Sequence, residues 1–251
     1  MAEKQLIFFD LDGTLAESKS QIDDEMAGLL NKLLERKKVA IISGGAYPQF
    51  EKQLIARLAV CGARNLENLF LFPTCGTAFY NFSDGDWHCV YQERLSANEQ
   101  NLIIQSFGEA FAAISYQHPL ALYGDVIENR GSQITFSALG QRASVEEKQK
   151  WFDANNHKRI EIQMALARLL PDFEVRLGGL TSIDVTKKGL DKAYGVMQAS
   201  KHLNMPIESI VFIGDALYEG GNDHAVIRTG TETVSVKNPE ETKKIIKSIL
   251  L

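Results

Sequence analysis

Short apolar runs alternate with longer amphipathic stretches in the first part of the chain. The runs at residues 6–9, 39–42 and 69–72 have the length and composition of buried strands. Residues 22–37 and 50–58, which lie between these runs, carry apolar side chains at helical spacing. Alternation of this kind predicts a parallel sheet with helices on both faces.

The middle of the chain follows a different pattern. A turn of the hairpin type interrupts residues 79–91. Helical periodicity marks residues 99–113 and 145–170, and we expect the second of these helices to break near Asn155-Asn156. Further strands are predicted at 125–127, 133–136, 173–177 and 181–185. This order of elements predicts an α+β layer built on an antiparallel sheet.

Near its C-terminal end the chain returns to the first pattern. It predicts a helix, two strands and a last helix that begins at Pro239 after the capping residue Asn238. The simplest architecture is one α/β core formed by residues 1–83 and 187–251. A second domain, residues 84–186, is then inserted into this core.

Composition excludes several classes of partner. A formal net charge of −5 argues against a nucleic-acid-binding protein, which usually carries a basic patch. The three cysteines are isolated and lack the pairing of a zinc site, which suits a reducing compartment. No signal peptide is visible, and the apolar runs are far shorter than a membrane span. We therefore expect a cytoplasmic protein that binds neither nucleic acid nor membrane.

Two carboxylates follow the first apolar run. Asp10 and Asp12 lie two residues apart at the end of a predicted strand, before Gly13 and Thr14. The carboxyl ends of strands are where α/β sheets bind ligands. Carboxylates at this position can hold a hard cation such as Mg²⁺, or one of them can attack phosphorus and form an aspartyl-phosphate. A plain Asp-Gly turn is the structural alternative, and this motif alone leaves it open.

The string from Phe9 to Leu15 resembles the first motif of the haloacid dehalogenase superfamily, in which the first Asp is the nucleophile. Matches to the other three motifs follow in order. Ser43 ends the second apolar run, Lys192 precedes a helix, and Gly214-Asp215 follows a strand. Lys187 and Lys188 are the nearest competitors for the third motif.

This resemblance implies a role for each matched residue. Asp10 would be the nucleophile, Asp12 the general acid and base, Ser43 a donor to the phosphoryl group and Lys192 the neutralising cation. Mg²⁺ would be held by Asp10, a main-chain carbonyl of Asp12 and Asp215. Asn222 and Asp223 would orient metal-bound water, with direct ligation by Asp223 as the alternative.

A narrower resemblance covers nearly the whole chain. Gly220-Gly221-Asn222-Asp223-His224 is similar to the eukaryotic-type phosphomannomutase family, within subfamily IIB of the superfamily. It implies a Rossmann-like parallel-sheet core with an inserted α+β cap domain of the C2 type. The implied substrate-binding residues are Gly44, Arg130, Arg142, Ser182 and Asp184. Arg142 is one position away from the family's second phosphate-binding Arg, and Lys148 stands where a further Arg is expected.

The family resemblance implies conversion of mannose 6-phosphate to mannose 1-phosphate, with Mg²⁺ and a hexose 1,6-bisphosphate activator. Members often dimerise through the cap, so a homodimer is one expectation. The chain also departs from the family. No Arg follows closely after Leu15, Ser43 is a phosphatase-like choice, and residues 72–76 replace a usual Glu-Asn-Gly. A sugar-phosphate phosphatase on the same scaffold therefore stays open. A catalytically silent sugar-phosphate-binding protein is disfavoured, because all the core motif residues are present.

Overall fold

The computed structural model describes residues 4–251, which form two compact units. The first unit comprises the residues up to Gln92 together with Leu190–Leu251, and the second comprises Glu93–Gly189. The insertion predicted at residues 84–186 starts earlier than the second unit. This difference arises because the strand Asp86–Gln92 pairs with the strand before it, inside the sheet of the first unit.

The first unit is built on a seven-stranded sheet with the order β11-β10-β1-β2-β3-β4-β5. The pairs from β11 to β3 are parallel, and β4 and β5 extend the sheet as an antiparallel hairpin. Its strands are β1 (Leu6–Asp10), β2 (Lys38–Ile42), β3 (Leu69–Phe72), β4 (Ala78–Ser83), β5 (Asp86–Gln92), β10 (Ile210–Gly214) and β11 (Glu232–Ser235).

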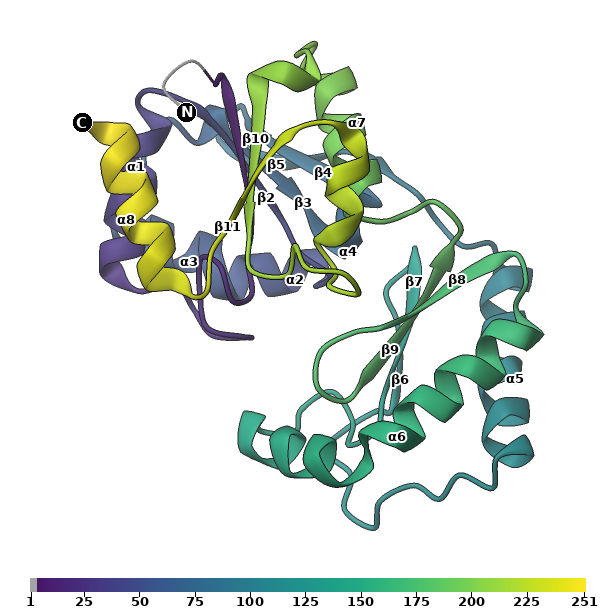
Figure 1. Ribbon diagram of the computed structural model, residues 1–251. Helices are drawn as coiled ribbons and strands as arrows, with labels where there is room; N and C mark the ends of the chain where they lie inside the picture. The colour runs from purple at the N-terminus through teal and green to yellow at the C-terminus, as the bar shows by residue number, and fades with distance from the viewer. Residues whose placement is uncertain (1–3) are drawn as a thin grey trace. The chain divides into compact units, whose positions relative to one another are not determined.

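Helices cover both faces of this sheet (Figure 1). Ile7 and Phe9 of β1 pack in one apolar cluster with side chains of α1 (Asp24–Leu34), α3 (Ala56–Val60) and α8 (Pro239–Leu250). Leu6 and Phe8 point to the other face and pack with Val196 of α7 (Lys192–His202). Both faces of β1 are buried, which explains why its sequence is a continuous apolar run.

The predicted helix at residues 50–58 is divided into three parts. α2 (Tyr47–Phe50) leads into a π-helical turn, η1 (Glu51–Ile55), which continues as α3. The short 3-10 turns are η2 (Leu66–Asn68), η3 (Ile207–Ser209) and η4 (His224–Thr229). The turn α4 (Pro73–Gly76) contains two left-handed residues, Thr74 at φ 48° and Cys75 at φ 57°.

The second unit contains a four-stranded antiparallel sheet with the order β6-β7-β9-β8. Its strands are β6 (Ile127–Asn129), β7 (Gln133–Ser137), β8 (Phe173–Leu177) and β9 (Ser182–Lys187). Two helices, α5 (Ala97–Ala113) and α6 (Val145–Leu169), bury one face of this sheet (Figure 1). The predicted break near Asn155-Asn156 is wrong. α6 runs through this point, where the Asn155 side chain donates to the Trp151 carbonyl one turn earlier.

The predicted fold class is confirmed: a parallel-sheet α/β unit carries an inserted α+β unit. Among residues 4–251, no helix combines the length and the apolar content that a membrane crossing requires.

Candidate active site

Three carboxylates meet at the carboxyl edge of the large sheet. Asp10 is the last residue of β1, Asp215 directly follows β10, and Asp223 closes the loop after β10. Because β1 and β10 are parallel neighbours, their carboxyl ends lie side by side. Each of the three carboxylates offers an oxygen within 4.8 Å of the others. The sequence predicts Asp10, Asp215 and Asp223 at one site, and the structure brings these three side chains together.

Lys192 lies inside this carboxylate cluster. Its Nζ is 2.6 Å from Asp10 Oδ1 and 2.5 Å from Asp223 Oδ1. The Lys192 and Asp10 side chains are 1% and 3% exposed, and that of Asp223 is fully buried. The second oxygen of Asp223 accepts a hydrogen bond from the Ala216 amide at 3.0 Å. Asp223 therefore anchors Lys192 to the loop after β10, while Asn222 beside it is exposed.

Burial shapes the charges of this cluster. It raises the pKa of Asp10 well above its usual value, with a further rise from Asp223, although Lys192 counteracts both. The pKa of Asp215 is raised mainly by burial and by Asp223. Burial alone would lower the pKa of Lys192, but Asp10 and Asp223 outweigh it and the pKa rises. Lys192 is therefore a permanent cation among carboxyls whose ionisation is costly, and a bound dication would favour their ionised form.

The close approach of the first loop to Asp215 depends on Gly13. This residue has φ +87°, and a Cβ at its position would lie 2.5 Å from Asp215 Oδ2. The neighbouring Thr14 hydroxyl donates to Asp215 Oδ1 at 3.3 Å. The Asp-Gly-Thr string thus brings the loop after β1 into contact with the loop after β10. The interpretation of this string as a plain turn does not explain that contact.

Asp12 has a separate environment from the three clustered carboxylates. Its Oδ2 accepts from the Ser43 hydroxyl at 3.2 Å. Its Oδ1 accepts from the Lys19 amide at 2.6 Å and from Gln53 Nε2 at 3.2 Å. Ser43 follows β2, and its Oγ also accepts from the Gly45 amide at 3.1 Å. Sequence reasoning brings Asp12 and Ser43 together but misses Gln53, which stands on a helix without any recognisable motif.

The turn at residues 73–76 contacts both the loop after β2 and the helix α7. The Cys75 amide donates to the Ser43 carbonyl at 2.9 Å, and Cys75 Sγ lies against Gly44. Gly76 faces Gly195 of α7, and a Cβ on Gly76 would lie 2.3 Å from the Gly195 Cα. This backbone contact fixes how closely α7 approaches the turn.

A further ion pair holds the start of α7. Asp191 caps this helix by accepting from the Ala193 and Tyr194 amides. The Arg228 guanidinium on η4 lies 2.7 Å from both carboxylate oxygens of Asp191. Because Lys192 follows Asp191, this pair ties the lysine to the segment after Asp223. No motif in the sequence marks Arg228.

The predicted substrate residues of the second unit lie partly on one face of its sheet. Arg130 contacts a single oxygen of Glu128, Oε2, with both Nε at 2.8 Å and Nη2 at 2.7 Å. Glu128 stands opposite Thr135, whose hydroxyl donates to Asp184 Oδ1 at 2.7 Å. Register therefore places Arg130, through its partner Glu128, near Asp184. The sequence does not predict the Glu128 partner.

The other residues of this unit that the family resemblance singles out do not form one cluster. Ser182 lies two residues before Asp184 in β9 and therefore shares its face of the sheet, opposite Ser137. The Arg142 guanidinium packs against Gly124, and its amide donates to the Tyr123 carbonyl at 2.8 Å. Lys148 is buried on α6.

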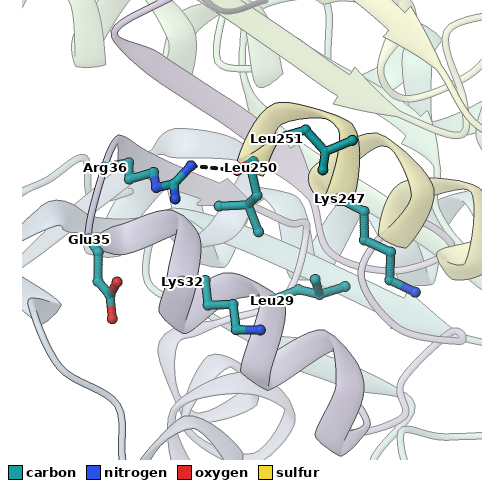
Figure 2. A pocket seen from close by; sticks show the side chains of 7 residues that line it. All are labelled: Leu29, Lys32, Glu35, Arg36, Lys247, Leu250 and Leu251. Atoms are coloured by element: carbon teal, nitrogen blue, oxygen red, sulfur yellow. Dashed lines mark hydrogen bonds between the residues drawn. The ribbon is translucent and has the colours of Figure 1, made fainter.

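A pocket of about 570 Å³ lies apart from these residues, between α1 and α8 (Figure 2). It is lined by Leu29, Lys32, Glu35, Arg36, Lys247, Leu250 and Leu251. The end of α1 leads into the start of β2, so the pocket stands at the amino end of the strands. The carboxylate cluster stands at the opposite, carboxyl end of the strands, and none of its residues lines this pocket.

Comparison with known proteins agrees with this geometry. The family model described as eukaryotic phosphomannomutase matches residues 26–251. A phosphomannomutase of Encephalitozoon cuniculi is 28% identical over 99% of this chain and 94% of its own length. Phosphomannomutase 1 of Homo sapiens is 26% identical over 96% of this chain and 90% of its own length.

Solved structures support the fold. The IMP-nucleotidase of Plasmodium falciparum superposes with a TM-score of 0.71 at 17% identity, covering 98% of this chain and 68% of its own. A haloacid dehalogenase-like hydrolase of Bacteroides thetaiotaomicron superposes with a TM-score of 0.63 at 16% identity, covering 98% and 99%. The family that the sequence motifs indicate is thus confirmed, and the chain belongs to the eukaryotic phosphomannomutase family.

Proposed function

We propose that this protein is a Mg²⁺-dependent phosphotransferase that acts on hexose phosphates through an aspartyl-phosphate. Its main reaction would be the conversion of mannose 6-phosphate to mannose 1-phosphate, primed by a hexose 1,6-bisphosphate. The observation that carries the proposal is the group formed by the buried Asp10, Lys192 and Asp223 with the half-buried Asp215 at the carboxyl edge of the sheet. Family membership supports the same reaction.

The residues at this edge fit a magnesium ion. Mg²⁺ prefers oxygen ligands and is usually bound by one or two carboxylates together with substrate phosphate. Asp10 and Asp215 would hold it, with Asp223 either ligating directly or orienting bound water. When bound, the ion would neutralise charge on the phosphoryl group during transfer.

The catalytic residues would divide the work of phosphoryl transfer. Asp10 would attack phosphorus, and Asp12 would give a proton to the leaving sugar oxygen and later take one from the next attacking hydroxyl. Ser43 would donate its hydroxyl to the phosphoryl oxygens. Lys192 would offset the negative charge that Asp10 and the phosphoryl group share, as a fixed point charge.

The second unit would select the sugar. Arg130 and Arg142 would bind the distal phosphate, and Ser182 and Asp184 would bind hydroxyl groups. Contacts with the non-reacting end of the substrate supply binding energy that positions the reacting end. Water must also be excluded while the aspartyl-phosphate exists, because hydrolysis would end the mutase cycle. We further propose a homodimer formed through residues 84–186, which light scattering after size-exclusion chromatography would test.

A phosphatase is the second candidate, because Ser43 is a phosphatase-like residue in the loop that contacts Asp12. It would share the first half-reaction, after which Asp12 would activate water instead of a sugar hydroxyl. The two functions differ only in the fate of the phosphoryl group on Asp10.

Phosphorus NMR separates these functions in one experiment. The protein is mixed with mannose 1-phosphate, Mg²⁺ and a trace of a hexose 1,6-bisphosphate. A growing 6-phosphate signal with little inorganic phosphate supports the mutase. Growth of inorganic phosphate alone supports the phosphatase, and an unchanged spectrum contradicts both.

A further inference from the structure

Gln53 is a buried polar side chain whose hydrogen bonds converge on Asp12. The residue is only 3% exposed to solvent. Nε2 donates to Asp12 Oδ1 at 3.2 Å and to the Ser20 carbonyl at 2.8 Å. Oε1 accepts from Gln49 Nε2 at 2.6 Å. Both partners of Nε2 are pure acceptors and the partner of Oε1 is a donor, so the amide has a single orientation that satisfies all three.

The π-helical turn explains how Gln53 reaches this position. Residues 51–55 form a wider turn than an α-helix, and such turns are frequent at functional sites. Two carbonyls of this turn bind the loop after the Asp10–Leu15 string: Lys52 O accepts from Gln21 Nε2 at 3.0 Å, and Gln53 O accepts from the Ile22 amide at 2.9 Å. The same loop supplies the Lys19 amide that bonds Asp12. Gln53 therefore holds Asp12 directly and also through this loop.

The two oxygens of Asp12 have different partners. Oδ1 accepts from two amide N–H groups, those of Lys19 and Gln53, which together use its two lone pairs. Neither donor can accept a proton in return. Oδ2 contacts only the Ser43 hydroxyl among the bonds found in residues 4–251, and a hydroxyl can both donate and accept. The acid form of Asp12 can thus carry its proton on Oδ2 alone without breaking a hydrogen bond.

We propose that Gln53 is a positioning residue that reserves Oδ1 of Asp12 for hydrogen bonding, so that Oδ2 is the oxygen that exchanges protons with the substrate. This inference rests on the proposed function, since it assigns a geometry to the general acid and base. In the first half-reaction, a carboxylate oxygen of Asp10 bonds to phosphorus and the bond from phosphorus to the sugar oxygen breaks. The electron pair of that bond stays on the sugar oxygen, which takes the proton from Oδ2 and leaves as the alcohol.

The test compares two phosphate esters that differ in their need for a general acid. A sugar alkoxide must be protonated as it leaves, whereas p-nitrophenolate leaves as a stabilised anion. The kcat/KM for the donor ester reports formation of the aspartyl-phosphate, because later steps do not enter it. We expect Gln53→Met to lower kcat/KM for a hexose phosphate by about 10- to 100-fold, a part of what general acid catalysis contributes. For p-nitrophenyl phosphate we expect a change of no more than about twofold, because that reaction bypasses the acid.

A matched control separates this role from support of the fold. Gln21→Met removes one hydrogen bond between the same loop and the same π-helical turn, but the bonds of Gln53 to the Ser20 carbonyl and the Ile22 amide still hold the loop. We therefore expect kcat/KM with both esters to fall far less than in Gln53→Met. Gln49→Met leaves Gln53 in place but removes the donor that orients its amide. Gln49→Met should also lower kcat/KM for the hexose phosphate selectively, but by less than Gln53→Met does. It serves as the second variant if Gln53→Met folds poorly.

The results separate the positioning role of Gln53 from the proposed phosphotransferase function. Equal losses with both esters in Gln53→Met and Gln49→Met would mean that the amide only supports the fold, and the positioning role would be wrong. Selective loss with the hexose phosphate in either variant supports that role. If the wild-type protein transfers phosphate from neither ester in the presence of Mg²⁺, the proposed function itself fails.

Discussion

Two buried lysines in the first unit each pair with carboxylates, but these carboxylates differ in their exposure to solvent. Lys192 contacts Asp10 and Asp223 at the carboxyl edge of the sheet, and all three side chains are at most 3% exposed. Lys243 on α8 contacts Asp23 at 2.6 Å, Glu25 at 3.2 Å and Glu240 at 2.6 Å. The Lys243 side chain is 5% exposed, but its carboxylates are 50–69% exposed.

Because the carboxylates differ in burial, the pKa is raised at Asp10 and lowered at Asp23. Burial raises the pKa of Asp10 despite its lysine. At Asp23, partial burial acts to raise the pKa, but hydrogen bonds from Lys243 and the Met26 amide together outweigh it, so the pKa is lowered. A lysine among carboxylates is therefore not a catalytic signature by itself. Carboxylates that share a dry edge with their lysine stay poised for a metal or a phosphoryl group, whereas solvated ones form an ordinary tie between α1 and α8.

Neutralising one carboxylate in each cluster should give the largest difference between them. Asp10→Asn should lower turnover of a hexose phosphate by at least about 1,000-fold, because the proposed nucleophile is lost. Asp23→Asn should leave turnover within about twofold, since asparagine also caps a helix. Steady-state rates with Mg²⁺ and bisphosphate measure both variants. Retention of more than about a tenth of the activity in Asp10→Asn would remove this residue as nucleophile.

Removing each lysine tests the effect of solvation on stability. Lys192→Met leaves two buried carboxylates without their cation and should destabilise the fold by about 3–5 kcal/mol. Lys243→Met should cost about 1 kcal/mol or less, because water solvates its former partners. Urea unfolding in the presence of EDTA compares the two. Equal losses would show that exposure of the carboxylates does not decide the strength of the cluster.

The helices that carry the two clusters differ in how closely they are packed, and a glycine in each tests this. Gly195→Ala on α7 would place a Cβ 2.6 Å from Ile42 Cδ1 and 3.1 Å from Gly76 Cα. We expect a loss of about 1–3 kcal/mol from overpacking. Gly28 on α1 has open space around it, so Gly28→Ala should stabilise by about 0.5–1 kcal/mol through helix propensity. Thermal unfolding measures the sign of the stability change in each variant. Stabilisation by Gly195→Ala would contradict the close contact at the turn.

The smallest expected effect is the pH dependence of the Lys243 cluster. The pKa of Asp23 is lowered from 3.8 in the folded protein, so its contribution is complete above pH 3.8 and is lost as the pH falls through the lowered value. The raised pKa of Lys243 keeps its charge to above pH 10.5. The difference in urea midpoint between the wild type and Lys243→Met should thus be constant from about pH 5 to pH 9 and shrink below pH 3.8. A difference that grows on acidification would show that the carboxylates do not act through their charge.

Asp10 should show the opposite slope in the metal-free protein. Its pKa is raised in the fold, so the folded state binds a proton that the unfolded state has already lost above pH 3.8. Stability should therefore fall as the pH rises through this window, and Asp10→Asn should remove this decline. The pH dependence of stability in Lys243→Met and in Asp10→Asn should therefore differ in sign between the two clusters.

Much of the fold was accessible from local patterns. The apolar runs that became β1, β2, β3 and β10 were buried on both faces, so each gave a continuous signal. The hairpin of β4 and β5 was also recognised, but its assignment to the large sheet was not. Strand pairing across β3 and β4 sets Phe70 opposite Asn81 and Leu71 opposite Tyr80, a register that the periodicity of either strand alone does not record.

Irregular local structure was harder to anticipate. The π-helical turn interrupts a segment that reads as one helix, and the long α6 crosses two asparagines that favour a break. In both cases tertiary contacts override local preference. At Gln53 these contacts are the hydrogen bonds to Asp12 and Ser20, and on α6 Arg159 donates to the Gly178 and Gly179 carbonyls.

The sequence by itself determined which chemical groups are present and where each strand delivers them. Asp10, Ser43 and Asp215 stand directly at or after strand ends, and parallel strands bring such positions to one edge whatever the details of packing. Only the tertiary structure decided which partners they meet. Lys192 is 182 residues from Asp10, and Arg228 is 37 from Asp191. Distances and burial set charge and orientation, and these exist only once the chain has closed around them.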